Sequence, residues 1–173
     1  GIYVDELTQP GYVSRLAYPT YKPRTFVSSG YMGTLGWGYA AALGVKAVKP
    51  DEPVVSVSGD GGFLFTGNEI ATAVHHGINL VTIVFTDGAY GNVRRIQQQM
   101  YDNKVIASEL TNPDFVAYAE SFGAAGLRAE KPEQLEGKIK QALALEWPTI
   151  IEVPMGDVPS PWPFLMLPKL RGV

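Results

Sequence analysis

Two apolar, β-branched runs, each leading into glycine and aspartate, constrain the fold of this chain more than any other feature. The first run covers residues 54–57 and leads into Gly59-Asp60-Gly61-Gly62. The second covers residues 80–84 and leads into Asp87-Gly88. A stretch with helical character follows each cluster. Buried strands that alternate with helices are typical of an α/β fold with a parallel sheet, so both aspartates are expected at the carboxyl ends of strands.

The carboxyl edge of an open α/β sheet is where such folds bind ligands. Asp60 and Asp87 would bring two hard oxygen ligands to this edge, beside flexible glycines and the N-termini of the following helices. This combination suits a Mg²⁺ or Ca²⁺ ion that holds a diphosphate. A simple turn role for Asp60 is the competing interpretation, because Asp and Gly are favoured in turns. The second aspartate in the same strand–loop–helix context favours the metal site.

The composition excludes several classes of protein. The 173 residues suffice for one domain, and a net charge of −3 with scattered Lys and Arg gives no support for a nucleic-acid partner. The absence of cysteine excludes disulfides and thiolate metal sites. No apolar run approaches the ~18 residues of a membrane span. The chain also lacks an N-terminal basic segment followed by an apolar core, so we expect a cytoplasmic protein with no membrane contact.

Strands and helices alternate along the chain. The pattern predicts strands at residues 25–29, 54–57, 80–85, 124–129 and 149–153. It predicts helices at residues 39–48, 68–76, 92–99, 113–121 and 132–145, the fourth with Asn112 as its capping residue and Pro113 at its first position. These elements predict a three-layer α/β/α domain with a mainly parallel sheet at residues 1–153. The Pro-rich residues 154–173 are expected to form a tail without regular structure, packed on the surface through Trp162 and Phe164.

These residues resemble the thiamine diphosphate-dependent enzymes related to acetolactate synthase and the 2-oxoacid decarboxylases. The diphosphate-binding domain of that family carries Gly-Asp-Gly and a second metal ligand downstream, and the 27 positions from Asp60 to Asp87 fit its spacing. Residues 33–38, Gly-Thr-Leu-Gly-Trp-Gly, are similar to the family's Gly-Thr-Met-Gly-Phe-Gly. Residues 68–74 and 91–95 are similar to the helices after the two ligands. The resemblance implies the thiamine diphosphate-binding fold, with thiamine diphosphate and Mg²⁺ as cofactors.

The resemblance also assigns roles to individual residues. The implied metal ligands are the carboxylates of Asp60 and Asp87 and the backbone carbonyl of Ala89. Leu35 matches the bulky apolar residue that bends the cofactor and so brings its amino group to the carbon that loses a proton. The other positions implied to contact the cofactor are Gln9, Gly33, Gly59, Gly61, Gly62, Tyr90, Gly91 and Asn92. For Tyr90, aromatic packing is the default interpretation beside a place in the pocket. Arg94 and Arg95 either meet an anionic substrate or form a solvated basic turn.

Three departures from the family pattern bear on function. Many relatives have Asn-Asn at Thr86-Asp87, so this chain carries one more negative charge at the metal. Ile96 stands where acetolactate synthases usually have Trp, which points to the wider reaction class rather than to acetolactate synthesis. The family's catalytic glutamate lies in a separate pyrimidine-binding domain that has no counterpart here, so no catalytic residue is expected in this chain.

We therefore expect the C-terminal diphosphate-binding domain of a lyase or transferase that decarboxylates, cleaves or ligates 2-oxoacid-type substrates. Its activity would require a pyrimidine-binding domain of the same or another subunit, usually within a homodimer or homotetramer. One alternative is a natural small subunit of a two-chain decarboxylase. Another is a non-catalytic cofactor-binding or scaffold domain, against which the two metal ligands and Leu35 both count.

Overall fold

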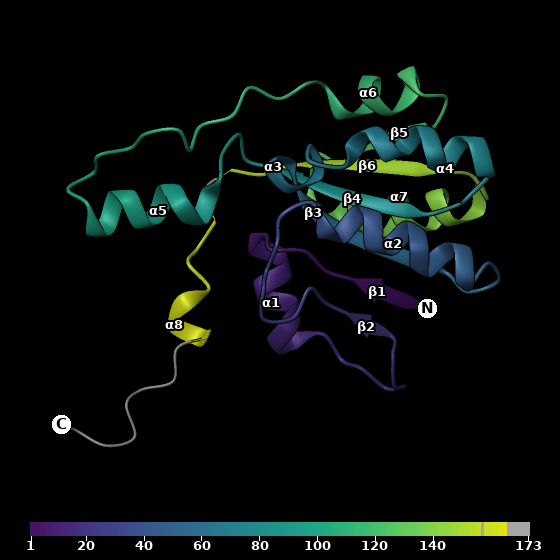
Figure 1. The fold of residues 1–173 in the computed structure, drawn as a ribbon, viewed down its shortest axis with the longest axis horizontal. Helices are drawn as coiled ribbons and strands as arrows, with labels where there is room; N and C mark the ends of the chain where they lie inside the picture. Colours follow the sequence, from purple (N-terminus) through teal and green to yellow (C-terminus); the bar gives the residue numbers. More distant parts are fainter. Residues whose placement is uncertain (157, 166–173) are drawn as a thin grey trace.

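Six parallel strands form one sheet at the centre of the fold (Figure 1). The structure is a computed structural model and describes residues 1–156 and 158–165. The sheet has the order β2-β1-β3-β4-β6-β5, and each neighbouring pair is parallel. The strands are β1 (Ile2–Val4), β2 (Phe26–Val27), β3 (Val54–Gly59), β4 (Val81–Thr86), β5 (Ala125–Arg128) and β6 (Thr149–Pro154).

Helices cover both faces of the sheet, as the repeated strand–helix pattern requires. One core cluster unites α2, α4 and α6 with one face, and a second packs α7 on the other. Tyr3 of β1 stacks on Tyr18, at the end of α1, with ring centroids 4.6 Å apart. The helices are α1 (Gln9–Ala17), α2 (Trp37–Val48), α3 (Asp60–Phe63), the 3₁₀ helix η1 (Gly67–Glu69), α4 (Ile70–His76), α5 (Gly91–Met100), α6 (Phe115–Ser121), α7 (Pro132–Ala144) and α8 (Trp162–Leu165).

The three-layer α/β/α fold predicted from the sequence is confirmed, and the expected strands and helices all form. Two predictions of detail are wrong. Asp114 caps α6, because its Oδ1 accepts a 2.9 Å hydrogen bond from the Ala117 N–H, whereas Asn112 points elsewhere. The tail contains the short helix α8. The prediction that Trp162 packs on the chain is confirmed by its contact with Tyr12, and the side chain of Phe164 lies outside the described part.

The order of the strands places the point where the chain changes direction between β1 and β3. From β1 the chain moves outward to β2, then returns to β3 on the opposite side and continues to β4. The loops that leave β1 and β3 therefore diverge and open a crevice at the carboxyl edge of the sheet. This is the position where open α/β sheets bind ligands.

The turn after β3 is anchored by aromatic packing. Phe63, the last residue of α3, is fully buried, and its ring meets Tyr39 edge-on at 5.1 Å and Phe115 at 5.8 Å. Such pairs contribute about 0.5–1.5 kcal/mol beyond the area that they bury. The segment that carries Asp60 is thus fixed from the core side, which leaves its polar groups to face the crevice.

Among the described residues, no helix has both the length and the apolar character needed to cross a membrane.

Candidate cofactor site

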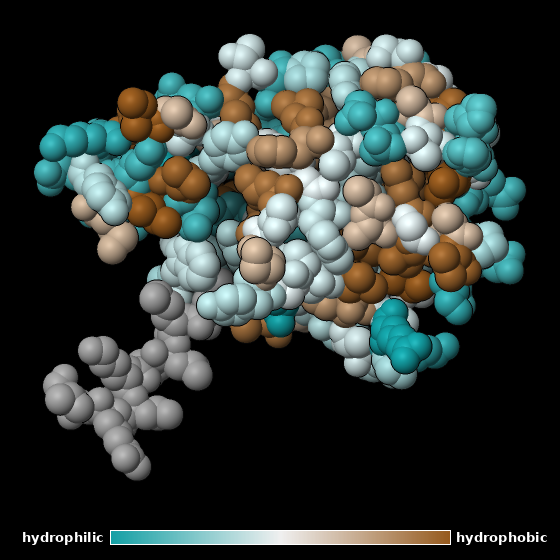
Figure 2. All heavy atoms as spheres, in the orientation of Figure 1, coloured by the Kyte–Doolittle hydropathy of each residue, from teal (hydrophilic) through white to brown (hydrophobic). Residues whose placement is uncertain are grey.

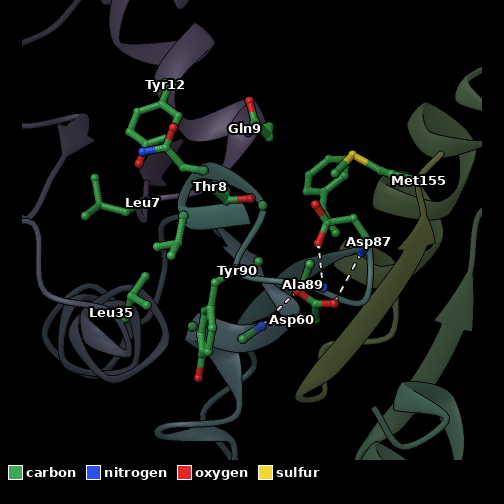
Figure 3. Close-up of a pocket in the computed structure, with 17 residues that line it drawn as sticks. Leu7, Thr8, Gln9, Tyr12, Leu35, Asp60, Asp87, Ala89, Tyr90 and Met155 are labelled. Atoms are coloured by element: carbon green, nitrogen blue, oxygen red, sulfur yellow. Dashed lines mark hydrogen bonds between the residues drawn. The ribbon is translucent and has the colours of Figure 1, made fainter. Parts of the chain in front are cut away.

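A pocket of about 240 Å³ opens at the crevice between the carboxyl ends of β1, β3 and β4 (Figure 3). It collects eleven of the twelve residues that the sequence assigned to the cofactor or the metal. These are Gln9, Leu35, Gly59, Asp60, Gly61, Gly62, Asp87, Ala89, Tyr90, Gly91 and Asn92. The sequence did not single out the other lining residues, which are Leu7, Thr8, Tyr12, Phe85, Val93 and Met155.

Asp60 is the most constrained polar side chain of the site, with 2% of its surface exposed. Its Oδ2 accepts hydrogen bonds from the backbone N–H groups of Asp87 (3.2 Å) and Gly88 (2.8 Å) and from the amide of Asn112 (2.6 Å). Its Oδ1 accepts one bond, from the Gly61 N–H at 2.8 Å. A carboxylate oxygen offers about two acceptor positions, so Oδ1 is the oxygen with capacity left for a cation.

Asp87 lies beside Asp60 on the loop that follows β4. Its Oδ1 accepts a 3.1 Å hydrogen bond from the Ala89 N–H. Burial raises the pKa of Asp87 and the charge of Asp60 raises it further, while the Ala89 N–H and the charge of Arg94 lower it. Two carboxylates held this close repel one another, and a divalent cation between them removes that repulsion.

Asn112 donates a hydrogen bond to Asp60, whereas the sequence predicts it as the cap of α6. It sits in the segment between α5 and α6, which runs alongside the loop that follows β4. The Tyr90 N–H donates to the Ser108 carbonyl and the Leu110 N–H to the Gly88 carbonyl, both at 2.8 Å. This pairing carries the Asn112 amide to Asp60. Because Pro113 follows it, Asn112 resembles a helix-capping residue in the sequence. Only the pairing of the two segments in the folded chain identifies Asp60 as its partner.

Three glycines of the site are required by close approach of neighbouring groups. A Cβ on Gly61 would lie 2.6 Å from the Tyr90 ring, and one on Gly62 would lie 2.7 Å from Glu6 Oε1. A Cβ on Gly91 would lie 2.6 Å from Asp87 Oδ2. Side chains at these positions would displace the tyrosine, the buried glutamate or the second carboxylate.

The pocket has an apolar side opposite its carboxylates. Figure 3 shows Leu7 and Leu35 together, away from Asp60 and Asp87. Gly33 is the one predicted cofactor residue that does not line the pocket. It has φ +57° and packs on Leu7, whose Cδ1 would lie 2.7 Å from a Cβ at this position. Gly33 thus shapes the loop that presents Leu35.

The segment after β6 closes one end of the site. Trp162 donates a 2.8 Å hydrogen bond from Nε1 to Oδ1 of Asn92, and its ring lies 5.1 Å from that of Tyr12. Arg95 donates to Gln9 Oε1 and to the Val158 carbonyl, each at 3.3 Å. Through these two bonds the Arg95 guanidinium joins α1, α5 and this segment. Arg94 and Arg95 also both line a polar hollow that adjoins the pocket.

The donor set fits a diphosphate held by a hard cation. Two carboxylates and the backbone of Ala89 gather on one wall of the pocket. In the described part of the chain, no cluster of three His, Cys, Asp or Glu side chains is placed to hold a metal ion by side chains alone. The first N–H groups of α5, at Gly91, Asn92 and Val93, face no helical acceptor and line the same pocket. Such a helix start attracts phosphate oxygens.

Comparisons with known proteins agree with this geometry. Residues 8–153 match the family described as thiamine pyrophosphate enzyme, C-terminal TPP binding domain. The chain is 46% identical over 138 residues to acetolactate synthase of Bacillus subtilis, covering 80% of this chain and 24% of that protein. It is 34% identical over 131 residues to the mitochondrial acetolactate synthase catalytic subunit of Saccharomyces cerevisiae, covering 76% and 19%.

Solved structures of thiamine diphosphate-dependent and related decarboxylases superpose on this fold. A 4-hydroxybenzoylformate decarboxylase of Rhodococcus jostii, described as thiamine diphosphate-dependent, superposes with a TM-score of 0.82 at 28% identity, covering 90% of this chain and 29% of that one. The benzoylformate decarboxylase of Polynucleobacter necessarius gives a TM-score of 0.79 at 26% identity, covering 89% and 30%. The chain belongs to the family of thiamine diphosphate enzyme C-terminal domains. It spans about a quarter of the length of its acetolactate synthase relatives.

Proposed function

We propose that the pocket binds thiamine diphosphate through Mg²⁺, as part of an enzyme that breaks or forms a bond next to a carbonyl group. The observation that carries this proposal is the pair Asp60 and Asp87 at adjacent strand ends. The two carboxylates repel one another, and burial raises the pKa of Asp87. A cation that satisfies both oxygens resolves this conflict.

The residues fit a six-coordinate ion with oxygen ligands. Asp60 would contribute Oδ1, Asp87 a second carboxylate oxygen and Ala89 its backbone carbonyl. These three protein oxygens leave room for diphosphate oxygens and water, which is how Mg²⁺ is commonly held in phosphate sites. Because Asp87 is an aspartate, this site would neutralise more of the ion's charge than an asparagine in its place.

The rest of the pocket fits the remaining parts of the cofactor. The N–H groups at the start of α5 would receive the diphosphate, with Gln9 and the Gly61-Gly62 backbone around it. Leu35, on the apolar wall, would support the bent form of the cofactor. When bound, thiamine diphosphate supplies a thiazolium ring that accepts the electrons released at the reacting carbonyl carbon. The chain's own contribution is to hold the metal, fix the bend and exclude water.

A second domain is needed to complete the site. Figure 2 shows hydrophobic groups among hydrophilic ones on the lobe that α5 forms beside the pocket. Val93, Ile96 and Met100 of α5 are 50%, 39% and 74% exposed, and Val13 and Leu16 of α1 are 50% and 58% exposed. We propose that a pyrimidine-binding domain covers this surface, supplies the catalytic glutamate and belongs to the same or a second subunit of a homodimer or homotetramer.

The reaction class proposed is lyase or transferase chemistry on a 2-oxoacid or a related carbonyl compound, in the cytoplasm. We further propose that residues 1–153 form the cofactor domain and that the Pro-rich residues from 154 onward act as a tail, of which residue 157 and residues 166–173 lie outside the described part of the chain. A small subunit of a two-chain enzyme remains the first rival, and recovery of a second polypeptide in the native preparation would favour it. A scaffold domain is the second, and detectable carboligase or lyase activity would rule it out.

The test is a thermal-shift titration with thiamine diphosphate, in the presence and absence of Mg²⁺. The variant Asp60→Asn keeps the shape of the side chain and removes one metal oxygen. Asp114→Asn serves as its matched control, since this aspartate caps α6 away from the pocket. Stabilisation that requires both cofactor and metal, persists in the control and disappears in Asp60→Asn supports the proposal; equal stabilisation of all three proteins contradicts it.

A further inference from the structure

Glu6 is a buried acidic residue that neither the metal nor the diphosphate explains. It follows β1 by two residues, and none of its surface is exposed. Its Oε1 accepts a hydrogen bond from the Gly36 N–H. The same oxygen would lie 2.7 Å from a Cβ on Gly62, and the Glu6 Cβ would lie 2.8 Å from one on Gly38. The side chain therefore sits between the loop that carries Leu35 and the turn that follows Asp60.

No cation accounts for this burial. Among the described residues, no Lys, Arg or His forms an ion pair with Glu6. The groups that face it are the N–H groups of Gly36 and Gly38, the Ser58 hydroxyl and Asp5. Asp5 is itself ion-paired with Arg15 at 2.6 Å.

The environment of the Glu6 carboxyl shifts its protonation equilibrium toward the neutral form. Burial raises the pKa of Glu6, and the hydroxyl and the two N–H groups lower it to a smaller degree. Its Oε2 is buried without a well-aligned hydrogen-bond partner in the described residues, as is the Ser58 Oγ. A buried carboxyl in such a place is stable when it carries a proton and makes hydrogen bonds as an uncharged group.

The backbone of Gly36 is held on both sides of its Cα. Glu6 accepts from its N–H, and the Thr66 hydroxyl donates to its carbonyl at 2.9 Å. Gly36 has φ +83° and caps the start of α2, immediately after Leu35. Movement of Gly36 would move Leu35 directly, because the two residues are adjacent in a loop that has no regular hydrogen bonding of its own.

We propose that Glu6 is a positioning residue that joins the Leu35 loop to the turn after Asp60 and so fixes the angle at which Leu35 supports the cofactor. This inference rests on the function proposed above. Glu6 acts through Leu35 and does not touch the cofactor. Glutamine at this position would keep an oxygen for the Gly36 N–H and an N–H group for Ser58, whereas leucine would keep neither.

The experiment compares wild type, Glu6→Gln, Glu6→Leu and the control Ser56→Ala in the enzyme assembled with its pyrimidine-binding domain. Ser56 is equally buried and shares a 2.7 Å hydrogen bond with Thr82 inside the sheet, away from both loops. Two quantities are measured: the Kd of thiamine diphosphate in Mg²⁺, and the rate of deuterium exchange at the reactive carbon of the bound cofactor. Neither measurement needs the substrate.

Glu6→Leu is expected to slow this exchange by roughly tenfold or more, since a shift of about 1 Å in a positioning group can reduce a rate 100-fold. Its Kd should change by a smaller factor, Glu6→Gln should restore the wild-type exchange rate, and Ser56→Ala should lower only the melting temperature. Wild-type exchange in Glu6→Leu, at full occupancy, would overturn the inference. Failure of the wild type to bind the cofactor would instead refute the proposed function.

Should Glu6→Leu fail to fold, Glu6→Asp decides the question. It keeps a carboxyl group at this position and withdraws it from the Gly36 N–H by the length of one methylene. Slower exchange at an unchanged Kd supports the positioning of Leu35 by this loop, and an unchanged exchange rate overturns it.

Discussion

Replacing Asn112 with alanine tests how Asp60, the first of the proposed metal ligands, is held. The Asn112 amide donates a 2.6 Å hydrogen bond to Oδ2 of Asp60. A hydrogen bond to a charged group contributes about 1.5–3 kcal/mol. The substitution also removes Asn112 Oδ1, which is buried without a partner among the described residues, and this offsets about 1 kcal/mol of the loss.

The net effect of Asn112→Ala is a loss of about 0.5–2 kcal/mol, which lowers the melting temperature of the metal-free protein by roughly 1–8 °C. The Mg²⁺ concentration needed for half-maximal cofactor binding should rise about tenfold or more, as for other residues that orient a metal ligand. Thermal unfolding and a Mg²⁺ titration measure the two effects. The control is Thr111→Ala, an exposed position in the same segment, with an expected change below about 0.5 kcal/mol. Equal melting temperatures and equal Mg²⁺ requirements in the two variants would refute the reasoning.

Three further predictions concern the loops around the pocket. Gly61→Ala places a Cβ 2.6 Å from the Tyr90 ring and should destabilise the protein by about 1–3 kcal/mol in thermal unfolding, whereas Gly44→Ala, in open space within α2, should stabilise it by up to about 1 kcal/mol. Leu35→Ala should reduce turnover of the assembled enzyme more than it weakens cofactor binding; equal losses in steady-state kinetics and in Kd would argue against its role in bending the cofactor. The folded state binds the Glu6 proton more tightly than the unfolded chain, because burial raises the pKa of Glu6. The contribution of Glu6 to stability is therefore greatest at pH values below its pKa in the unfolded chain, and it is lost as the pH rises through its higher pKa in the folded protein. Between these two pKa values, the melting temperature of Glu6→Gln should vary less with pH than that of wild type.

The sequence predicted the parts of the fold whose signals are local. The β-branched run of β4 and the periodic, Ala-rich α2 were found within one or two residues of their bounds. β1, a strand of three residues, was not predicted, and α3 was not predicted because Gly61 and Gly62 disfavour a helix until Phe63 anchors it. The sequence does contain a start signal for α1, Thr8 at the cap and Pro10 in the first turn, although no helix was predicted there.

The place of Asp60 and Asp87 in one pocket was predictable from the sequence, whereas their role as metal ligands stays a prediction. The two aspartates follow strands, and their place at the sheet edge is fixed by the parallel topology. Glu6 and Asn112 could not be found in this way, because each is defined by a partner about 30 or more positions away. An acidic residue after a strand has the appearance of a solvated side chain until the packing of Gly36 and Gly62 around it is known.

The most direct test of this account is the binding of thiamine diphosphate to wild type and to Asp60→Asn, followed by thermal shift as Mg²⁺ is titrated. The account predicts stabilisation of the wild type only when cofactor and Mg²⁺ are both present, and none in the variant under the same conditions. Stabilisation of the wild type by the cofactor without a divalent ion, or equal Mg²⁺-dependent stabilisation of Asp60→Asn, would contradict the metal site on which the account depends.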